Sequence, residues 1–183
     1  PAWLGPDESL LEEALRTELS SLRGGLPLQR EPEFDELARH HAFAMASRNF
    51  IGESDPEGVD HFERRRRLHP SLIGRSTEWV GGFIPLGGQS PQGFARALLA
   101  EHAASLPPLF EDMHWEAMGV GVSVEAGRGS VCLVLGEVWA DLSGKTSWGP
   151  DSGWECEGRT REGTARSQLS VRLVQGQKET PER

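Results

Sequence analysis

The chain has 183 residues, of which 37% are hydrophobic, and a formal net charge of −9 at pH 7. This length fits one domain with one core, and the longest apolar run, 130–135, is much shorter than the roughly 20 residues of a membrane-spanning helix. The negative charge argues against nucleic acid as a partner, because binding phosphates needs clustered Lys and Arg. One basic run, Arg64–Arg67, stands close to Asp60 and Glu63 and is interpreted as a solvated helix end.

The first half of the chain carries the helical patterns. Ser9 and Glu12 fit a capping box, and apolar residues at helical spacing predict a helix that ends before Gly24. A second helix is expected from Pro32, because proline is tolerated in a first turn. His41 lies on the apolar stripe of this helix, so it is interpreted as a hydrogen-bonded core residue and not as a ligand.

Two shorter helices are expected further along the chain. One begins at Asp60, and the other opens at Ser90–Pro91 and is ended by the prolines after Leu106. Between them, 69–90 contains several glycines and prolines, so we interpret it as a loop with one short strand near 78–80.

The pattern then changes from helical to alternating. Residues 118–124 and 130–139 are predicted strands joined by a hairpin turn at 126–129, and 165–174 is a predicted third strand. The segment 144–163 is rich in Gly, Trp and charged residues and is interpreted as a long loop. Helices that come early and strands that come late predict an α+β fold with an antiparallel sheet.

Two cysteines, Cys132 and Cys156, leave two alternatives open. They either form a disulfide worth roughly 3 kcal/mol or are unrelated reduced thiols, and no Cys/His spacing typical of zinc is present. Cys132 lies in a predicted buried strand, so a thiol nucleophile is not expected there. Ser76 stands near histidines in the sequence, but the chain has no Gly-x-Ser-x-Gly elbow, and no catalytic residue is assigned.

Four of the six tryptophans bear on the fold or on a partner. Trp115 and Trp139 flank or lie in the predicted sheet and are expected in the core. Trp148 and Trp154 lie in the glycine-rich segment that follows. There they either anchor a partner protein, a glycan or a lipid, or fold back over the edge of the sheet.

Five segments occur in the order in which similar segments occur in the CAP superfamily of secretory, antigen-5 and pathogenesis-related proteins. They are 26–29 with the helix around 37–46, Asn49–Gly58, Glu78–Val80, Ser90–Pro91 and Met118–Val122. The chain resembles the bacterial secreted branch of this family over residues 8–140, which leaves 1–7 as a lead-in and 141–183 as a C-terminal extension. The resemblance implies a three-layer α-β-α sandwich with a central, mainly antiparallel sheet.

The resemblance also implies a cavity lined by two histidines and one or two glutamates that can hold a divalent metal. The first histidine falls on Glu53, whereas the family's glutamate is kept as Glu78. The second histidine falls on Leu106, and His102 could replace it only if the end of the helix is rebuilt. The metal site is therefore expected to be largely lost, with His61 or His102 as the remaining imidazoles, and no metal or other cofactor is assigned.

These residues lead to one expected function and two alternatives. The expected function is a non-catalytic, extracytoplasmic binding module that holds a protein, glycan or lipid near Glu53 and Glu78 or at Trp148 and Trp154. If the two carboxylates face each other, a shared proton is an alternative to a bound hard cation; otherwise both are solvated surface groups. The other functions left open are a structural subunit of a secreted or surface assembly, and a metal-dependent hydrolase rebuilt around Glu53, Glu78 and His102 or His61.

Overall fold

The chain folds into two compact units. The computed structural model describes residues 7–22, 28–84, 90–106, 115–125 and 127–141, together with the backbone of 146–149, 153–156 and 159–160. The first unit comprises Pro1–Pro70 and Arg75–Glu137, and the second comprises Ser71–Gly74 and Val138–Arg183.

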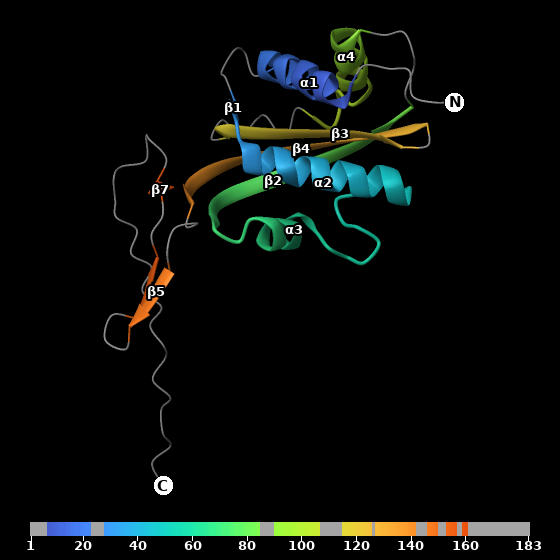
Figure 1. Ribbon diagram of the computed structural model, residues 1–183. Coiled ribbons are helices and arrows are strands. Elements are labelled where there is room, and N and C mark those ends of the chain that lie inside the picture. Colours follow the sequence, from blue (N-terminus) through green and yellow to red (C-terminus); the bar gives the residue numbers. More distant parts are fainter. Residues whose placement is uncertain are drawn as a thin grey trace. The chain divides into compact units, whose positions relative to one another are not determined.

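Four helices and a mixed, mostly antiparallel sheet make up most of the described chain (Figure 1). The helices are α1 (Glu8–Leu22), α2 (Pro32–Arg48), α3 (His61–Leu68) and α4 (Pro91–Glu101). The strands are β1 (Gln29–Arg30), β2 (Leu72–Phe83), β3 (Ala117–Glu125), β4 (Arg128–Asp141), β5 (Thr146–Gly149), β6 (Gly153–Cys156) and β7 (Arg159–Thr160). The main sheet has the order β1-β3-β4-β2, in which β1 runs parallel to β3 and β3 antiparallel to β4. In the second unit β5 pairs with β6, and β7 pairs with the end of β4 at Ala140 and Asp141.

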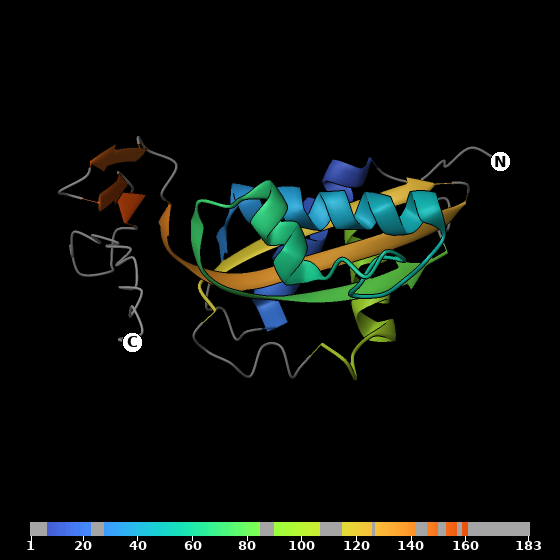
Figure 2. The ribbon, with the colours of Figure 1, turned by 90° about the horizontal axis from the view of Figure 1, so that it is seen from below.

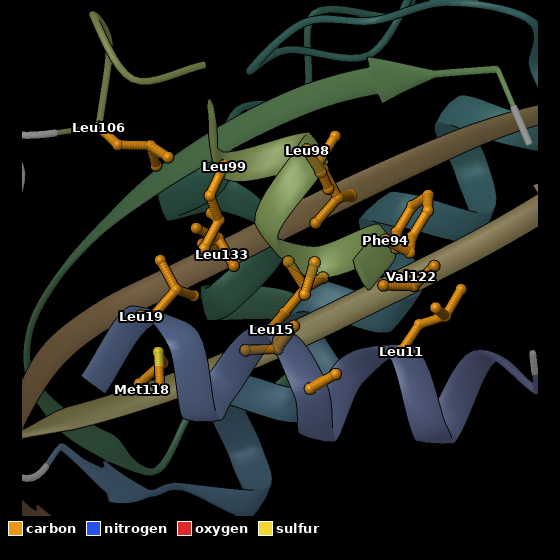
Figure 3. Close-up of a cluster of buried hydrophobic side chains, with 14 of the residues drawn as sticks. Leu11, Leu15, Leu19, Phe94, Leu98, Leu99, Leu106, Met118, Val122 and Leu133 are labelled. Carbon is orange, nitrogen blue, oxygen red and sulfur yellow. The ribbon is translucent and has the colours of Figure 1, made fainter. Parts of the chain in front are cut away.

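The sheet is covered by helices on both faces. Figures 1 and 2 show α1 and α4 on one face and α2 and α3 on the other. The first face holds the large apolar core, to which α1 contributes Leu11, Leu15 and Leu19 and the strands contribute Met118, Val120, Val122, Val131, Leu133 and Leu135 (Figure 3). This arrangement confirms the predicted α+β fold with three layers.

Small residues of β3 allow α2 to lie directly against the other face. A side-chain carbon placed on Gly119 would stand 2.1 Å from the carbonyl carbon of Phe34, and one placed on Gly121 would stand 2.2 Å from that of Ala38. Because neighbours along a strand alternate between its faces, the sequence 118–122 puts large residues toward α1 and α4 and glycines toward α2. The Gly-Val-Gly-Val pattern therefore serves both faces of the sheet: its glycines let α2 lie close to the strand, and its valines pack toward α1 and α4.

Carboxylates cover the amide groups along the outer edge of β3. Strand β1 pairs with β3 only at Ala117 and Met118. Further along, three alternate β3 amides donate to acidic side chains of α1 and α2: Val120 to Asp35 at 3.0 Å, Val122 to Glu12 at 3.3 Å and Val124 to Glu8 at 2.7 Å. Arg16 and Arg39 bind the Asp35 and Glu12 carboxylates at 2.8 and 2.5 Å, which ties the two helices to the same edge.

Two helix ends differ from the sequence expectation. The cap of α1 is Asp7, whose carboxylate accepts from the Ser9 amide at 2.7 Å, because an aspartate serves as well as a serine at a helix start. Glu12, expected in the capping box, is instead buried against the sheet. Helix α4 ends at Glu101 with His102 as its C-cap, before the prolines that were expected to end it.

The strands show the larger differences. Strand β2 has 12 residues, although only a short strand near 78–80 was predicted. The segment expected as a long loop contains β5, β6 and β7. Trp139, expected in the core, is 45% exposed, because it occupies an outward position of β4. The predicted strand at 165–174 lies outside the described residues.

Candidate functional site

A polar cluster is buried between the sheet and helices α2 and α3. Strand β2 contributes Ser76 and Glu78, which are two residues apart and so point to the same face. The other members are His41 of α2, His61 and Arg64 of α3, and Cys132 of β4. All six are between 0% and 8% exposed. A cluster of this kind needs internal partners, because an unpaired buried charge is strongly destabilising.

Glu78 stands at the centre of the cluster. One carboxylate oxygen accepts a hydrogen bond from Arg64 at 2.7 Å and lies 3.6 Å from Nε2 of His41. The other accepts from Nδ1 of His61 at 3.3 Å and from the Cys132 thiol at 3.5 Å. Both oxygens are therefore occupied by groups of the chain itself.

Arg64 is the cation that balances Glu78. Its guanidinium also donates to the main-chain oxygens of Val59 and Glu53, each at 2.9 Å. Two acceptors from the connection between α2 and α3 and one from β2 thus fix its position beside the carboxylate. The helix places it there because His61 and Arg64 are three residues apart and share one face of α3.

His61 links Glu78 to Ser76. Its Nε2 lies 2.7 Å from the Ser76 hydroxyl, which also accepts from Nη1 of Arg65 at 3.1 Å. His61 is thus held at both ring nitrogens, one by a carboxylate and one by a hydroxyl. Phe62, the next residue, is 66% exposed and packs its ring edge-on against the imidazole with centroids 5.6 Å apart.

His41 and Cys132 are neutral members of the cluster. Burial is the main cause that lowers the pKa of His41 below its ordinary 6.5, and the charge of Glu78 opposes this only in part. Burial, followed by the charge of Glu78, raises the pKa of the Cys132 thiol well above 9.0. Cys132 is a free thiol in this structure, and His41 donates from Nε2 to the Gly52 carbonyl at 2.8 Å. The interpretation of His41 as a hydrogen-bonded core histidine is confirmed.

Glu78 itself is ionised. Burial favours its protonated form, but the hydrogen bond from His61 and the charge of Arg64 oppose burial, and the pKa of Glu78 lies below 4.5. The cluster therefore contains one carboxylate and one guanidinium with opposite charges.

The buried His41 makes stability depend on pH. The pKa of His41 in the folded chain lies below the unfolded value of 6.5. Below pH 6.5 the unfolded chain therefore binds more protons than the folded chain, and the free energy of unfolding falls as the pH drops through this range. We expect His41→Gln to make stability less dependent on pH between about 5 and about 7.5. Urea unfolding across this range measures the slope. His40→Gln, at the exposed neighbouring position, is the matched control, and an unchanged slope in His41→Gln would contradict the assignment.

The structure brings two of the predicted site residues together, His61 and Glu78. Glu53 is exposed and contributes its main-chain oxygen to Arg64, whereas its carboxylate makes no hydrogen bond or ion pair to another described residue. The two glutamates therefore do not share a proton. The expectation that the Arg64–Arg67 run is solvated is wrong for Arg64, which is 4% exposed, while Arg66 and Arg67 are exposed and pair with Glu63.

His102 and Leu106 lie on the opposite face of the sheet. His102 packs against Trp79 with ring centroids 5.0 Å apart, and Trp79 packs against the core formed with α1 and α4. Leu106 is 1% exposed in that same core. Neither position is next to Glu78, because Glu78 and Trp79 are adjacent in β2 and point to different faces. Leu106 and His102 therefore take no part in the cluster around Glu78, where Arg64 is the neighbouring cation.

Trp148 and Trp154 are register partners in the β5–β6 hairpin. Their side chains lie outside the described residues, so their expected role in contacting a partner stays a prediction.

The donor set around Glu78 does not fit a divalent cation. A cation there would stand beside the charged Arg64 and compete with it for the one carboxylate. Within the described ranges, no group of three or more His, Cys, Asp or Glu side chains is arranged to hold a metal ion.

The described helices include none that is long and apolar enough to cross a membrane.

Sequence signals for this cluster were present but weak. Ser76 and Glu78 at strand spacing, and His61 and Arg64 at helix spacing, mark two polar faces that can meet. Hydrophobic periodicity could not find them, because it detects apolar stripes.

Comparisons with known proteins agree with the architecture. No family model matches the sequence, and no curated protein matches it. An outer surface protein from Borrelia burgdorferi is similar in structure, with a TM-score of 0.56 and 14% identity over 73% of this chain and 96% of that one. An extracellular protein containing a SCP domain from Bacillus anthracis str. Ames has a TM-score of 0.53 and 15% identity over 69% of this chain and 41% of that one. The chain therefore has the fold of the SCP, or CAP, domain, as the resemblance of its sequence segments implied.

Proposed function

We propose that this chain is a non-catalytic binding module of CAP type that works outside the cytoplasm and uses no metal. The observation that carries the proposal is the position of Arg64, which supplies the positive charge beside Glu78 from within the chain. The extracellular and surface proteins that share the fold support the location. The domain we propose for this role is 8–140, with 141–183 as an extension.

Exposed side chains next to the cluster provide a surface for a partner. Ile51 and Phe62 are 54% and 66% exposed. Ile51 precedes Gly52, the acceptor for His41, and Phe62 follows His61. Glu53 is exposed in the same segment as Ile51. We call these three residues (Ile51, Glu53 and Phe62) the Phe62 surface and infer that they contact a protein, a glycan or a lipid, since they combine apolar side chains with one carboxylate and each is, or adjoins, a residue that contacts the cluster.

The first test is the metal content of protein purified without chelator. We expect much less than one zinc or calcium ion per chain, because the Glu78 carboxylate is already bound by Arg64. Elemental analysis and calorimetric titration with each ion measure this. Stoichiometric metal that is lost in Glu78→Ala would contradict the proposal and favour the metal-dependent hydrolase.

The second test concerns the partner. Soluble cell-surface glycans, and phosphatidylcholine vesicles with and without an anionic lipid, are titrated in the presence of EDTA. We expect binding that Phe62→Ala abolishes and that Phe43→Ala leaves intact, since Phe43 is also exposed, at 56%, but lies on α2. Specific oligomerisation that is lost when Trp148 and Trp154 are replaced would instead favour a structural subunit.

A further inference from the structure

Ser76, His61 and Glu78 form a hydrogen-bonded chain that the proposed function does not use. The Ser76 hydroxyl lies 2.7 Å from Nε2 of His61, and Nδ1 of His61 lies 3.3 Å from the Glu78 carboxylate. A hydroxyl, an imidazole and a carboxylate in this order, with these atoms facing each other, are the parts of an activated nucleophile. Such an arrangement is recognised by geometry and not by a sequence motif, so the missing Gly-x-Ser-x-Gly elbow does not exclude it.

The direction of each hydrogen bond follows from counting protons. Arg65 donates to the Ser76 oxygen, because a guanidinium has no acceptor. The ionised Glu78 can only accept, so Nδ1 of His61 donates to it, and in the neutral imidazole Nε2 is then the nitrogen with the lone pair. The one proton of Ser76 then points to Nε2. His61 is thus held as the tautomer that can take the proton of Ser76.

The surroundings favour an attack by the serine. Arg64 binds the other oxygen of Glu78 at 2.7 Å and keeps that carboxylate in place. Arg65 stands 3.1 Å from the Ser76 oxygen, so its positive charge stabilises the negative charge that this oxygen gains as its proton leaves. Ser76 and His61 keep 7% and 5% exposure, which suits a small reactant.

We propose that Ser76 is a reactive nucleophile that accepts one acyl group from a small activated carboxylic ester. The Ser76 oxygen attacks the ester carbonyl while its proton moves to Nε2 of His61. The bond between the serine oxygen and the acyl carbon forms, the bond to the leaving oxygen breaks, and the leaving alcohol takes the proton from His61. One acyl group per chain is transferred and no turnover is required, so this reactivity goes beyond the proposed binding function without replacing it.

The test uses p-nitrophenyl acetate and the intact chain. We expect a rapid release of p-nitrophenolate, a gain of one acetyl group in the intact mass, and a label that peptide mapping places on Ser76. Ser130 is the internal control, because its hydroxyl is buried but donates to the Ala42 carbonyl and has no histidine partner among the described residues.

Two variants distinguish activation of Ser76 by His61 from acetylation of an accessible hydroxyl without such activation. Ser76→Ala is expected to lose the label, and His61→Gln, which keeps a polar side chain of similar reach, is expected to slow acetylation of Ser76 by about 10²- to 10⁴-fold. Circular dichroism checks that both variants are folded.

Three results would overturn the proposal. They are the absence of an acetyl group on Ser76 in the folded protein, acetylation confined to Cys132 or the lysines, and acetylation of Ser76 that His61→Gln does not slow. None of these results depends on whether a metal or a partner binds, so they leave the proposed function to its own tests.

Discussion

Replacing Glu78 by Gln is expected to lower the free energy of unfolding by about 3 to 5 kcal/mol, because breaking a buried ion pair leaves one charge uncompensated. Arg64 is the charge left behind, and its side chain is 5% exposed. The main-chain oxygens that also bind Arg64 carry no full charge to replace the carboxylate. Urea unfolding followed by circular dichroism at neutral pH measures the loss.

A matched control uses an ion pair at the surface. Glu18 binds Arg96 at 2.9 Å, and the Arg96 side chain is 71% exposed. Glu18→Gln is therefore expected to cost less than about 1 kcal/mol. The double variant Arg64→Met with Glu78→Met should recover much of the stability lost in Glu78→Gln, since apolar replacements remove both charges together. A loss in Glu78→Gln as small as that of Glu18→Gln would show that water reaches the pair.

Gly119→Ala is expected to destabilise the protein by about 3 kcal/mol, at the upper end of what overpacking usually costs. The added carbon would stand 2.1 Å from the carbonyl carbon of Phe34 and 2.3 Å from its oxygen. Both atoms belong to the backbone of α2, so the whole helix must move away from the sheet. A thermal or urea unfolding curve of the purified variant measures the effect.

Gly52→Ala is the control for this substitution. The nearest neighbour of its added carbon would be the Ser54 carbonyl oxygen at 3.5 Å, which is ordinary contact. We expect a change within about 0.5 kcal/mol, as for most substitutions that disturb no packing. Equal stabilities of Gly119→Ala and Gly52→Ala would mean that α2 does not rest on β3 as described.

Much of the fold could be predicted because its core follows simple periodicities. The stripe of α1 that contains Leu11, Leu15 and Leu19 is apolar at helical spacing, and these three residues are fully buried. The turn between β3 and β4 was marked by Gly127, which has a φ of +78° that suits glycine. The local sequence was sufficient to predict these elements, because its preferences agree with the tertiary contacts that the elements make.

Strand β2 and the polar cluster show why the rest could not be predicted. The glycines at 81 and 82 resemble loop residues, yet Gly81 is required because a side chain there would meet the ring of Trp79 at 2.6 Å. Ser76 and Glu78 point inward, so the strand has no alternation of apolar and polar residues. Arg64 stands in a run of four arginines, and nothing in that run distinguishes the buried one. Partners from distant segments decide the burial of all three polar residues.

The carboxylates along β3 also affect how molecules of this protein behave toward each other. An exposed strand edge presents amide donors to which a strand of another molecule can add. Here Glu8 and Glu12 of α1 already accept from Val124 and Val122. Packing of α1 therefore prevents intermolecular strand pairing at this edge. A molecule in which α1 detaches loses part of its core and at the same time exposes β3 amides to which a strand of another molecule can add.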